Sequence, residues 1–133
     1  MALGRIKTKS VYDPAENSDG IRMLVTRYHP RIKGFKKGVG YDEWLRSLSP
    51  TAPTVKKFKA GKMTEREFGA HYLSYLANSK EAQNDLGYVR ELLKSGETVT
   101  LLCYEPEGEF CHRILLRGYV SNKTHRQIIA SRE

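Results

Sequence analysis

The two cysteines of the chain lie at either end of one short segment, and a histidine and an arginine follow the second. Cys103 ends an apolar run, and Cys111, His112 and Arg113 stand side by side beginning eight residues later. If a helix begins there, its free N–H groups and the guanidinium would favour an ionised thiol at Cys111. His112 could exchange a proton with a substrate, and Arg113 could grip a phosphate or carboxylate. The pattern predicts an anion site that is capable of thiol chemistry.

Each of these residues also has a structural interpretation. Cys103 fits a small core residue that ends a buried strand, and Cys111 fits either role. His112 fits an exposed position, and Arg113 fits an ion pair with the acidic turn that begins at Glu105. The cysteine spacing lacks the C-x-x-C redox pattern and matches no standard zinc site. We therefore expect reduced thiols and no bound metal.

A second group of basic residues lies in the segment IRMLVTRYHPR, whose first part is typical of a buried strand at 21–28. With the two-residue period of a strand, Arg27 and His29 share one face. A guanidinium inside an apolar strand needs a buried carboxylate or an anionic ligand, because burying it alone is costly. We expect Arg22, Arg27 and His29 to form the wall of the site opposite the cysteine-histidine-arginine segment.

The hydrophobic pattern predicts strands that are separated by helices. Strands are expected at 7–12, 21–28 and 98–104, with a short last strand at 126–131. Helices are expected at 41–49, after the capping box that starts at Thr64, at 80–94 and at 110–120. This order predicts a three-layer α/β fold, with a small parallel or mixed sheet flanked by helices. Ligands collect at the carboxyl ends of strands in such sheets, which is where Cys103 and Glu105 stand.

The bulk properties fit a single α/β domain over residues 1–133. With 39% hydrophobic residues, a chain of 133 residues can bury a core without extra support. Its apolar runs are too short for a membrane span of about 20 residues, and no export signal opens the sequence, so a cytoplasmic location is predicted. No phosphate-binding glycine pattern is present, which predicts no tightly held cofactor. We expect the loop at 31–40 and the C-terminal tail to be mobile, and no pattern indicates the oligomeric state.

The net charge of +8 and the isoelectric point of about 9.6 suggest an alternative function, the binding of nucleic acid. The charge gathers in two segments that are predicted to be loops, 31–37 and 56–62. Their lysines are Lys33, Lys36, Lys37, Lys56, Lys57, Lys59 and Lys62. Phe35 and Phe58 lie among them and could stack on bases. No recognition motif accompanies these residues, so a small anionic ligand is the first hypothesis and nucleic acid the second.

Four sequence elements occur in the order seen in a known family. They are VYDP…DGIRMLVTRYHPR, YDEWLRSLSPT, FGAHYLSYL and VTLLCYEPEGEFCHRILL. Over about residues 7–120 the chain resembles the domain of unknown function 488 family, in its YeaO-like branch. The resemblance implies a compact cytosolic α/β domain and brings no established reaction. The family pattern has an aspartate at the position of Thr26 and a tryptophan at that of His29, so Arg27 lacks the counterion that the family pattern supplies.

Overall fold

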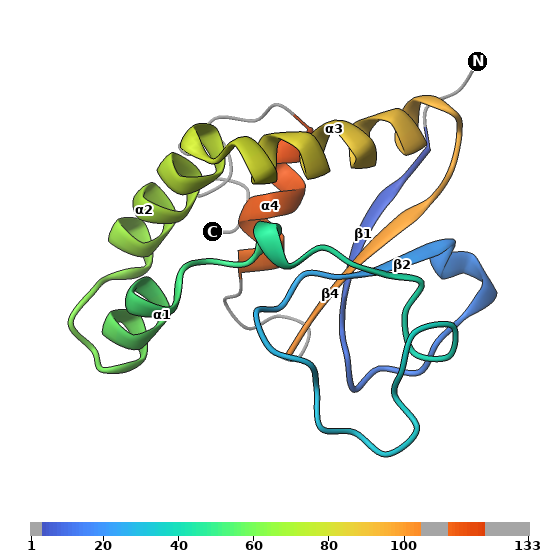
Figure 1. Cartoon of the computed structure of the whole chain (residues 1–133), viewed down its shortest axis with the longest axis horizontal. Coiled ribbons are helices and arrows are strands. Elements are labelled where there is room, and N and C mark those ends of the chain that lie inside the picture. The colour runs from blue at the N-terminus through green and yellow to red at the C-terminus, as the bar shows by residue number, and fades with distance from the viewer. Residues whose placement is uncertain (1–3, 105–111, 122–133) are drawn as a thin grey trace.

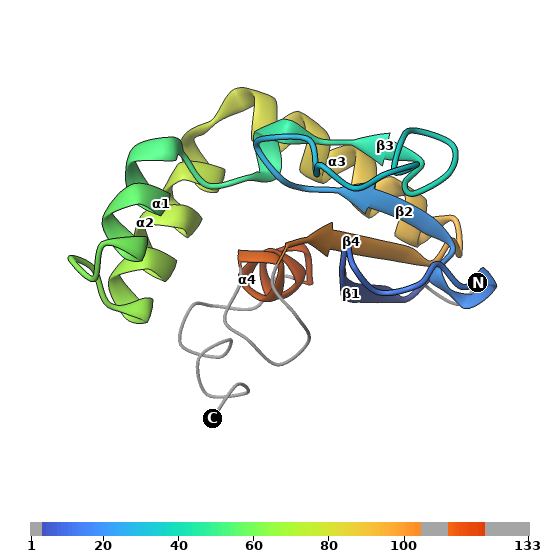
Figure 2. The same ribbon diagram turned by 90° about the horizontal axis from the view of Figure 1, so that it is seen from below.

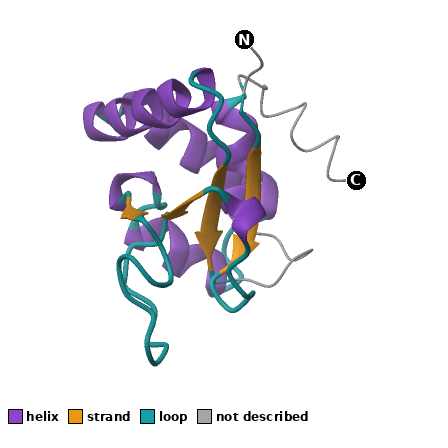
Figure 3. Cartoon of the chain, turned by 90° about the vertical axis from the view of Figure 1, so that its right-hand side faces the viewer, coloured by secondary structure: helices purple, strands orange, loops and turns teal. Residues whose placement is uncertain are grey.

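The computed structural model describes residues 4–104 and 112–121. In these ranges four strands form one sheet in the order β1–β4–β2–β3, and every neighbouring pair is parallel. The strands are β1 (Ile6–Ser10), β2 (Ile21–Leu24), β3 (Glu43–Trp44) and β4 (Val99–Cys103). Figure 3 shows the arrows of the long strands pointing toward the same end of the molecule. The carboxyl ends of the central strands β4 and β2 therefore lie side by side.

The helices gather around this sheet and beside it. The α-helices are α1 (Ala52–Lys59), α2 (Glu65–Asn78), α3 (Lys80–Lys94) and α4 (His112–Val120), and the short 3-10 helices are η1 (Asn17–Asp19) and η2 (Arg46–Leu48). The helices α1 and α2 pack on each other to one side of the strands, and α4 lies between them and the sheet (Figure 1 and Figure 2). Within the described part of the chain, no helix has the length and apolar character needed to cross a membrane.

Apolar side chains cover both faces of the sheet. On one face, Met23 and Leu101 pack against α2, α3 and α4. On the other face, Leu24 and Leu102 pack against Tyr41 and the loop that precedes it. Strand β4 is buried along its whole length, as its uninterrupted apolar sequence predicts for a central parallel strand. The predicted three-layer α/β fold is confirmed, and its sheet is parallel.

Several predicted elements agree with the structure in detail. Helix α3 has the predicted bounds, and β4 lies within the predicted strand. Helix α2 begins directly after Thr64, whose Oγ1 accepts a hydrogen bond from the Glu67 amide while the Glu67 carboxylate accepts one from the Thr64 amide. Strands β1 and β2 end earlier than predicted. The strand predicted at 126–131 lies outside the described residues.

The prediction of a helix at 41–49 is wrong. Glu43 and Trp44 form β3, which pairs with β2, and η2 follows directly. The indole Nε1 of Trp44 donates a 2.7 Å hydrogen bond to the backbone carbonyl of Thr26. This segment therefore forms a strand because it pairs with β2, which is about 20 residues earlier in the chain. The local sequence pattern does not reveal that partner.

The prediction of a loop at 56–62 is also wrong, because most of this segment lies on α1 and its last turn. Thr51 precedes the helix, and Pro53 lies in its first turn, where a proline removes no helical hydrogen bond. Gly61 follows with a φ of +75°, a conformation that ends a helix. No residue of α1 is fully buried, and its apolar row is too short to form the long stripe by which a helix is usually detected.

Candidate functional site

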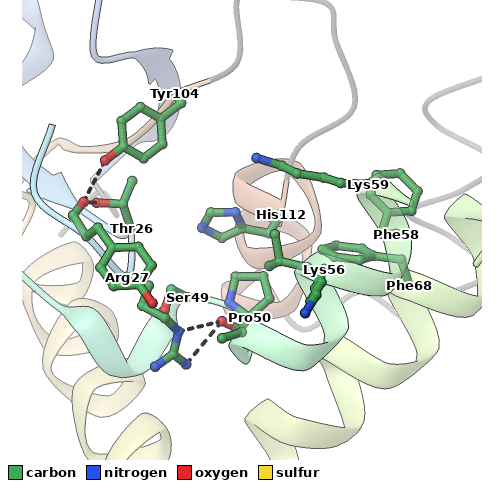
Figure 4. Close-up of a pocket in the computed structure, with 13 residues that line it drawn as sticks. Thr26, Arg27, Ser49, Pro50, Lys56, Phe58, Lys59, Phe68, Tyr104 and His112 are labelled. Carbon is green, nitrogen blue, oxygen red and sulfur yellow. Dashed lines mark hydrogen bonds between the residues drawn. The ribbon is translucent and has the colours of Figure 1, made fainter. Parts of the chain in front are cut away.

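A cavity of about 420 Å³ lies at the carboxyl ends of β2 and β4. Its walls come from the segment after β2, the residue after β4, the segment that leads into α1, α1 itself, α2 and the first residue of α4 (Figure 4). The lining residues are Thr26, Arg27, Tyr28, Ser49, Pro50, Ala52, Val55, Lys56, Phe58, Lys59, Phe68, Tyr104 and His112. This is the place where open α/β sheets collect ligands.

The segment that follows β2 is held by two hydrogen bonds to one carbonyl. The carbonyl of Tyr28 accepts from Thr26 Oγ1 at 2.8 Å and from the Tyr104 hydroxyl at 2.7 Å. Tyr104 directly follows β4, so its bond connects the segments that follow two neighbouring strands. Thr26 is buried, whereas Tyr28 is 65% exposed. The backbone that carries Arg27 is therefore fixed on both sides of that residue.

Arg27 lines the cavity with a guanidinium that is anchored to backbone. Its Nε and Nη2 donate to the carbonyl of Pro50 at 3.3 and 3.2 Å (Figure 4). In the ranges 4–104 and 112–121, no carboxylate forms an ion pair with Arg27. One expected partner of Arg27 was a buried carboxylate, and no described residue supplies one to it. The guanidinium keeps its positive charge next to the cavity.

Helix α1 adds two lysines to the same cavity. Lys56 and Lys59 are three residues apart, so both side chains leave α1 on the same side. Figure 4 shows the Lys59 side chain directed toward the part of the cavity where His112 lies. Neither ammonium group forms an ion pair with a carboxylate of the described residues. Together with Arg27, they make the cavity electropositive.

His112 is held in one orientation and in its neutral form. Its Nε2 lies 2.6 Å from the backbone carbonyl of Val25, and since a carbonyl can only accept, Nε2 carries the proton and Nδ1 the lone pair. Burial lowers the pKa of His112 to about 4, and the charge of Arg113 adds to this effect, although the bond to Val25 opposes it. At neutral pH the ring is an uncharged imidazole in the cavity wall.

A row of aromatic rings runs from α1 to His112. The ring centroids of Phe58 and Phe68 are 4.8 Å apart, and those of Phe68 and Tyr72 are 6.3 Å apart. Tyr72 meets the His112 ring edge to face at 5.6 Å. The Tyr72 hydroxyl donates to the carbonyl of Leu48, and burial raises the Tyr72 pKa well above its usual value. Phe58 and Phe68 give the cavity an aromatic wall, and Tyr72 supports His112 from behind it.

Arg113 does not line the cavity, in contrast to its predicted role in holding an anion. Its side chain is 1% exposed, and its Nη1 donates to the Cys103 sulfur at 2.9 Å. Consecutive residues of a helix point about 100° apart, so His112 reaches the cavity while Arg113 faces the sheet. The buried guanidinium joins α4 to the end of β4.

Cys103 is fully buried and takes part in a disulfide. Because the sequence contains two cysteines, Cys111 is the other cysteine that this chain can supply. The prediction of reduced thiols is therefore wrong for Cys103. Cys111 and Glu105, both predicted site residues, lie outside the described residues. Within the described ranges, no group of three His, Cys, Asp or Glu side chains is placed to hold a metal ion.

Arg22 is placed in an ion-pair network and does not line the cavity. Its guanidinium pairs with the carboxylate of Asp19, which is 0% exposed, and its Nε donates to the carbonyl of Gly40 at 2.9 Å. Lys9 Nζ approaches the same carboxylate at 2.9 Å. Although burial alone would raise the pKa of Asp19, hydrogen bonds from the Glu16 amide, Lys9 and Arg22 lower it to about 2. Arg22 has the kind of buried carboxylate partner that the sequence suggested for Arg27.

His29 packs against the aromatic side chains Phe35, Tyr41 and Trp44 and does not line the cavity beside Arg27. Its ring makes edge contacts with Phe35, Tyr41 and Trp44 at centroid distances of 5.9, 5.5 and 5.4 Å. Its Nε2 is 3.1 Å from the Tyr41 hydroxyl oxygen. Strand β2 ends before these residues, so the strand periodicity that put Arg27 and His29 on one face does not reach them. Of the predicted basic wall, Arg27 lines the cavity, whereas Arg22 and His29 do not.

Most of the cavity wall is not predicted from the sequence. The segment 56–62, predicted as a basic loop, lies largely on α1, and the helix predicted after Thr64 carries no signal that Phe68 borders a cavity. A usable signal was present in α1, where Val55 and Phe58, like Lys56 and Lys59, are spaced by one helical turn. With Pro53 just before them, this spacing indicates a short helix with one apolar and one basic row.

Comparisons with known proteins give one family and one relative. A family model described as "Active DUF488-N3 subclade" matches residues 6–124 of the chain. The chain is also similar to "Uncharacterized protein YeaO" of Escherichia coli (strain K12), with 40% identity over 77 residues. That match covers 57% of this chain and 65% of YeaO, which is slightly less than two thirds of the relative. No solved structure matches the chain significantly.

Proposed function

The chain belongs to the DUF488-N3a family, and we propose that it binds a small organic anion in the cavity at the ends of β2 and β4. The observation that carries this proposal is that Arg27, Lys56 and Lys59 line one cavity, and no carboxylate of the described residues pairs with any of them. Neighbouring like charges repel each other, and a cleft lined by one sign of charge concentrates the opposite ion. An anion is the ligand that relieves this repulsion.

The apolar part of the wall supports the same proposal. Pro50, Val55, Phe58 and Phe68 border the cavity close to the charged side chains. Apolar walls exclude water, and an ion pair is stronger where water is excluded. Ligand sites commonly combine a mostly apolar lining with a few polar groups that fix the ligand. The ligand is therefore an organic molecule with an apolar body, rather than a small inorganic ion alone.

We assign His112 the role of proton acceptor in this site. Its ring is neutral, its Nε2 proton is held by Val25, and the acceptor nitrogen Nδ1 belongs to the ring that lines the cavity. A neutral imidazole can take a proton from a hydroxyl group or from water near a bound ligand. The description of the family as an active subclade supports a reaction over binding alone.

The narrower form of the proposal is thiol chemistry at Cys111, which precedes His112 in the sequence. Because Cys103 is in a disulfide, this chemistry needs a reduced protein. The rate of alkylation by iodoacetamide against pH, measured on the reduced Cys103→Ser variant, tests it. A thiol pKa well below 8 supports catalysis by Cys111. An ordinary thiol pKa overturns the thiol chemistry and leaves anion binding in place.

Calorimetry of the full chain with inorganic phosphate, acetate and phenyl phosphate at low salt tests anion binding. We expect the double substitution Lys56→Gln and Lys59→Gln to weaken binding about tenfold, because two cations leave the cavity. Lys57→Gln is the matched control, since Lys57 is exposed on the same helix but does not line the cavity. An equal loss in the control, or no binding of any anion by the unchanged protein, overturns the proposal.

Nucleic-acid binding is the alternative function. The lysines and phenylalanines predicted to serve it lie in surroundings that differ from those expected. The lysines at 56–62 lie on α1 and its last turn, not in a loop. Phe35 packs against His29 and Tyr41, and Phe58 lines the cavity beside Phe68, so the two rings do not flank one basic groove as the sequence suggested. Fluorescence anisotropy with labelled single and double strands at several salt concentrations tests this function. Tight, steeply salt-dependent binding would favour it over a small anion.

A further inference from the structure

We propose that the ligand of this cavity carries a planar aromatic ring within a few bonds of its anionic group, as aryl phosphates and aryl carboxylates do. The inference rests on the proposed function, because it names the class of anion that the same cavity binds. It depends on two rows of side chains on α1, one apolar and one cationic. It also depends on the contact between the apolar row and an aromatic ring of α2.

Helix α1 presents two adjacent rows of side chains to the cavity. Val55 and Phe58 form an apolar row, and Lys56 and Lys59 form a cationic row. The members of each row are one helical turn apart, and the rows are offset from each other by one residue, or about 100° around the helix axis. A ligand that lies along α1 meets apolar surface and positive charge side by side. Its charged group must therefore be close to its apolar body.

The apolar row continues into an aromatic surface. Phe58 and Phe68 contact each other with centroids 4.8 Å apart and a tilt of 42° between the rings. Figure 4 shows these two rings next to each other, on the side of the cavity opposite Thr26 and Tyr104. Aromatic pairs are favoured over contacts of equal area with saturated groups by roughly twofold to tenfold in affinity. The wall therefore selects a planar ring over a saturated one.

The charge on the cationic row is positioned to act on a group attached to that ring. Figure 4 shows Lys59 extending from the side of Phe58 toward His112. Lys59 follows Phe58 in the sequence, so its ammonium group starts from a neighbouring position on the helix. A phosphate or carboxylate on a ring that packs on Phe58 lies within reach of this side chain. A long flexible spacer between ring and anion would separate the two contacts.

The test is a comparison of matched anions by calorimetry on the full chain. Phenyl phosphate is compared with cyclohexyl phosphate, and benzoate with cyclohexanecarboxylate, since each pair has the same charge and a similar size. We expect the aryl member of at least one pair to bind about threefold to tenfold more tightly. Phenyl phosphate should also bind more tightly than 4-phenylbutyl phosphate, in which a spacer separates the ring from the anion. The pair in which the aryl compound binds more tightly, phosphate or carboxylate, identifies the anionic group of the ligand.

The outcomes separate this inference from the proposed function. Equal binding of the aryl and saturated members overturns the aromatic ligand and leaves the anion site standing. Failure of every anion to bind overturns both. The variant Phe58→Leu should remove the aryl preference, and Tyr12→Leu, which changes an exposed ring outside the cavity, should leave the preference intact. If Phe58→Leu lowers the melting temperature strongly, the ligand comparison in the unchanged chain decides.

Discussion

His112 on α4 donates a hydrogen bond of 2.6 Å to the backbone carbonyl of Val25 at the end of β2, although the two residues are 87 positions apart in the chain. The bond fixes the tautomer of the ring and its direction in the cavity wall. It also ties a titratable group of the cavity to the sheet. The protonation of His112 and the stability of the fold are therefore linked.

This linkage predicts that the protein loses stability in mildly acidic solution. Burial lowers the pKa of His112 to about 4, below the value near 6.5 that an unfolded chain has. Between these values the unfolded state binds more protons, so the stability is fully present above pH 6.5 and is lost as the pH falls toward 4. We expect the free energy of unfolding to fall by roughly 2–3 kcal/mol over this window, measured by urea unfolding at several pH values.

Two variants identify the group that is responsible for this slope. His112→Gln cannot titrate, so it should flatten the dependence of the unfolding free energy on pH. His71→Gln removes an exposed histidine on α2 and should keep the slope of the unchanged protein. An unchanged slope in the His112 variant would show that other groups cause the loss.

The ring of Tyr72, rather than its hydroxyl, is expected to support His112. Tyr72→Phe keeps the edge contact with the imidazole and loses the hydrogen bond to the Leu48 carbonyl. We expect it to lower the free energy of unfolding by about 1–2 kcal/mol while the His112 pKa stays near 4. Tyr72→Leu should raise the His112 pKa, because water gains access to the ring. NMR titration of the histidine ring protons measures the His112 pKa in each variant. Equal pKa values in Tyr72→Phe and Tyr72→Leu would contradict this role of the ring.

Asp19 is expected to be important for stability and not for ligand binding. Asp19→Asn leaves the buried Arg22 guanidinium without its charged partner, which should lower the free energy of unfolding by about 3 kcal/mol. Affinity for phenyl phosphate should not change in protein that is still folded, because neither Asp19 nor Arg22 lines the cavity. Glu91→Gln on α3 is the control for loss of an exposed carboxylate.

The Asp19 carboxylate should also make the free energy of unfolding depend on pH in strongly acidic solution. Its pKa is about 2 in the folded chain and near 3.8 in the unfolded chain, so its contribution is present above about pH 3.8 and is lost as the pH falls toward 2. Acid unfolding followed by circular dichroism should show this loss. A folded Asp19→Asn variant should not show that part of the transition, and an identical acid profile would contradict the assignment.

Reduction of the disulfide at Cys103 should destabilise the protein. A crosslink that closes a loop of about nine residues contributes roughly 2–3 kcal/mol by constraining the unfolded chain. The melting temperature should therefore fall when a phosphine reductant is added. Cys103→Ser should show the lower melting temperature without reductant and no further change with it. Two free thiols in unreduced protein, detected with Ellman's reagent, would contradict the bond.

Elements with strong local signals could be predicted from the sequence. The uninterrupted apolar residues of β4 indicate a strand that is covered on both faces, and the Thr64–Glu67 pair marks the start of α2. Helix α3 shows apolar residues at helical spacing from its first turn to its last. Helix α4 lies within the predicted helix at 110–120. Each of these features depends on residues that are close together in the chain.

The features that were missed depend on distant partners or on side-chain direction. Trp44 has apolar neighbours at helical spacing, and its strand forms because β2 offers an edge to pair with. Arg113 has the right neighbours for an anion site, but one step around α4 turns it into the core. The role of Arg22 depends on Asp19, which ends η1 and is buried in the folded chain. Local composition does not contain these facts.

Helix α1 supplies five of the thirteen residues that line the cavity and yet has no fully buried residue of its own. Little apolar surface has to be exposed when this helix separates from its neighbours, whereas β4 can open only if the whole sheet comes apart. Amide hydrogens on α1 should therefore exchange with deuterium much earlier than those on β4. An occupied cavity would slow that exchange first, which makes α1 the natural reporter of whether a compound has entered.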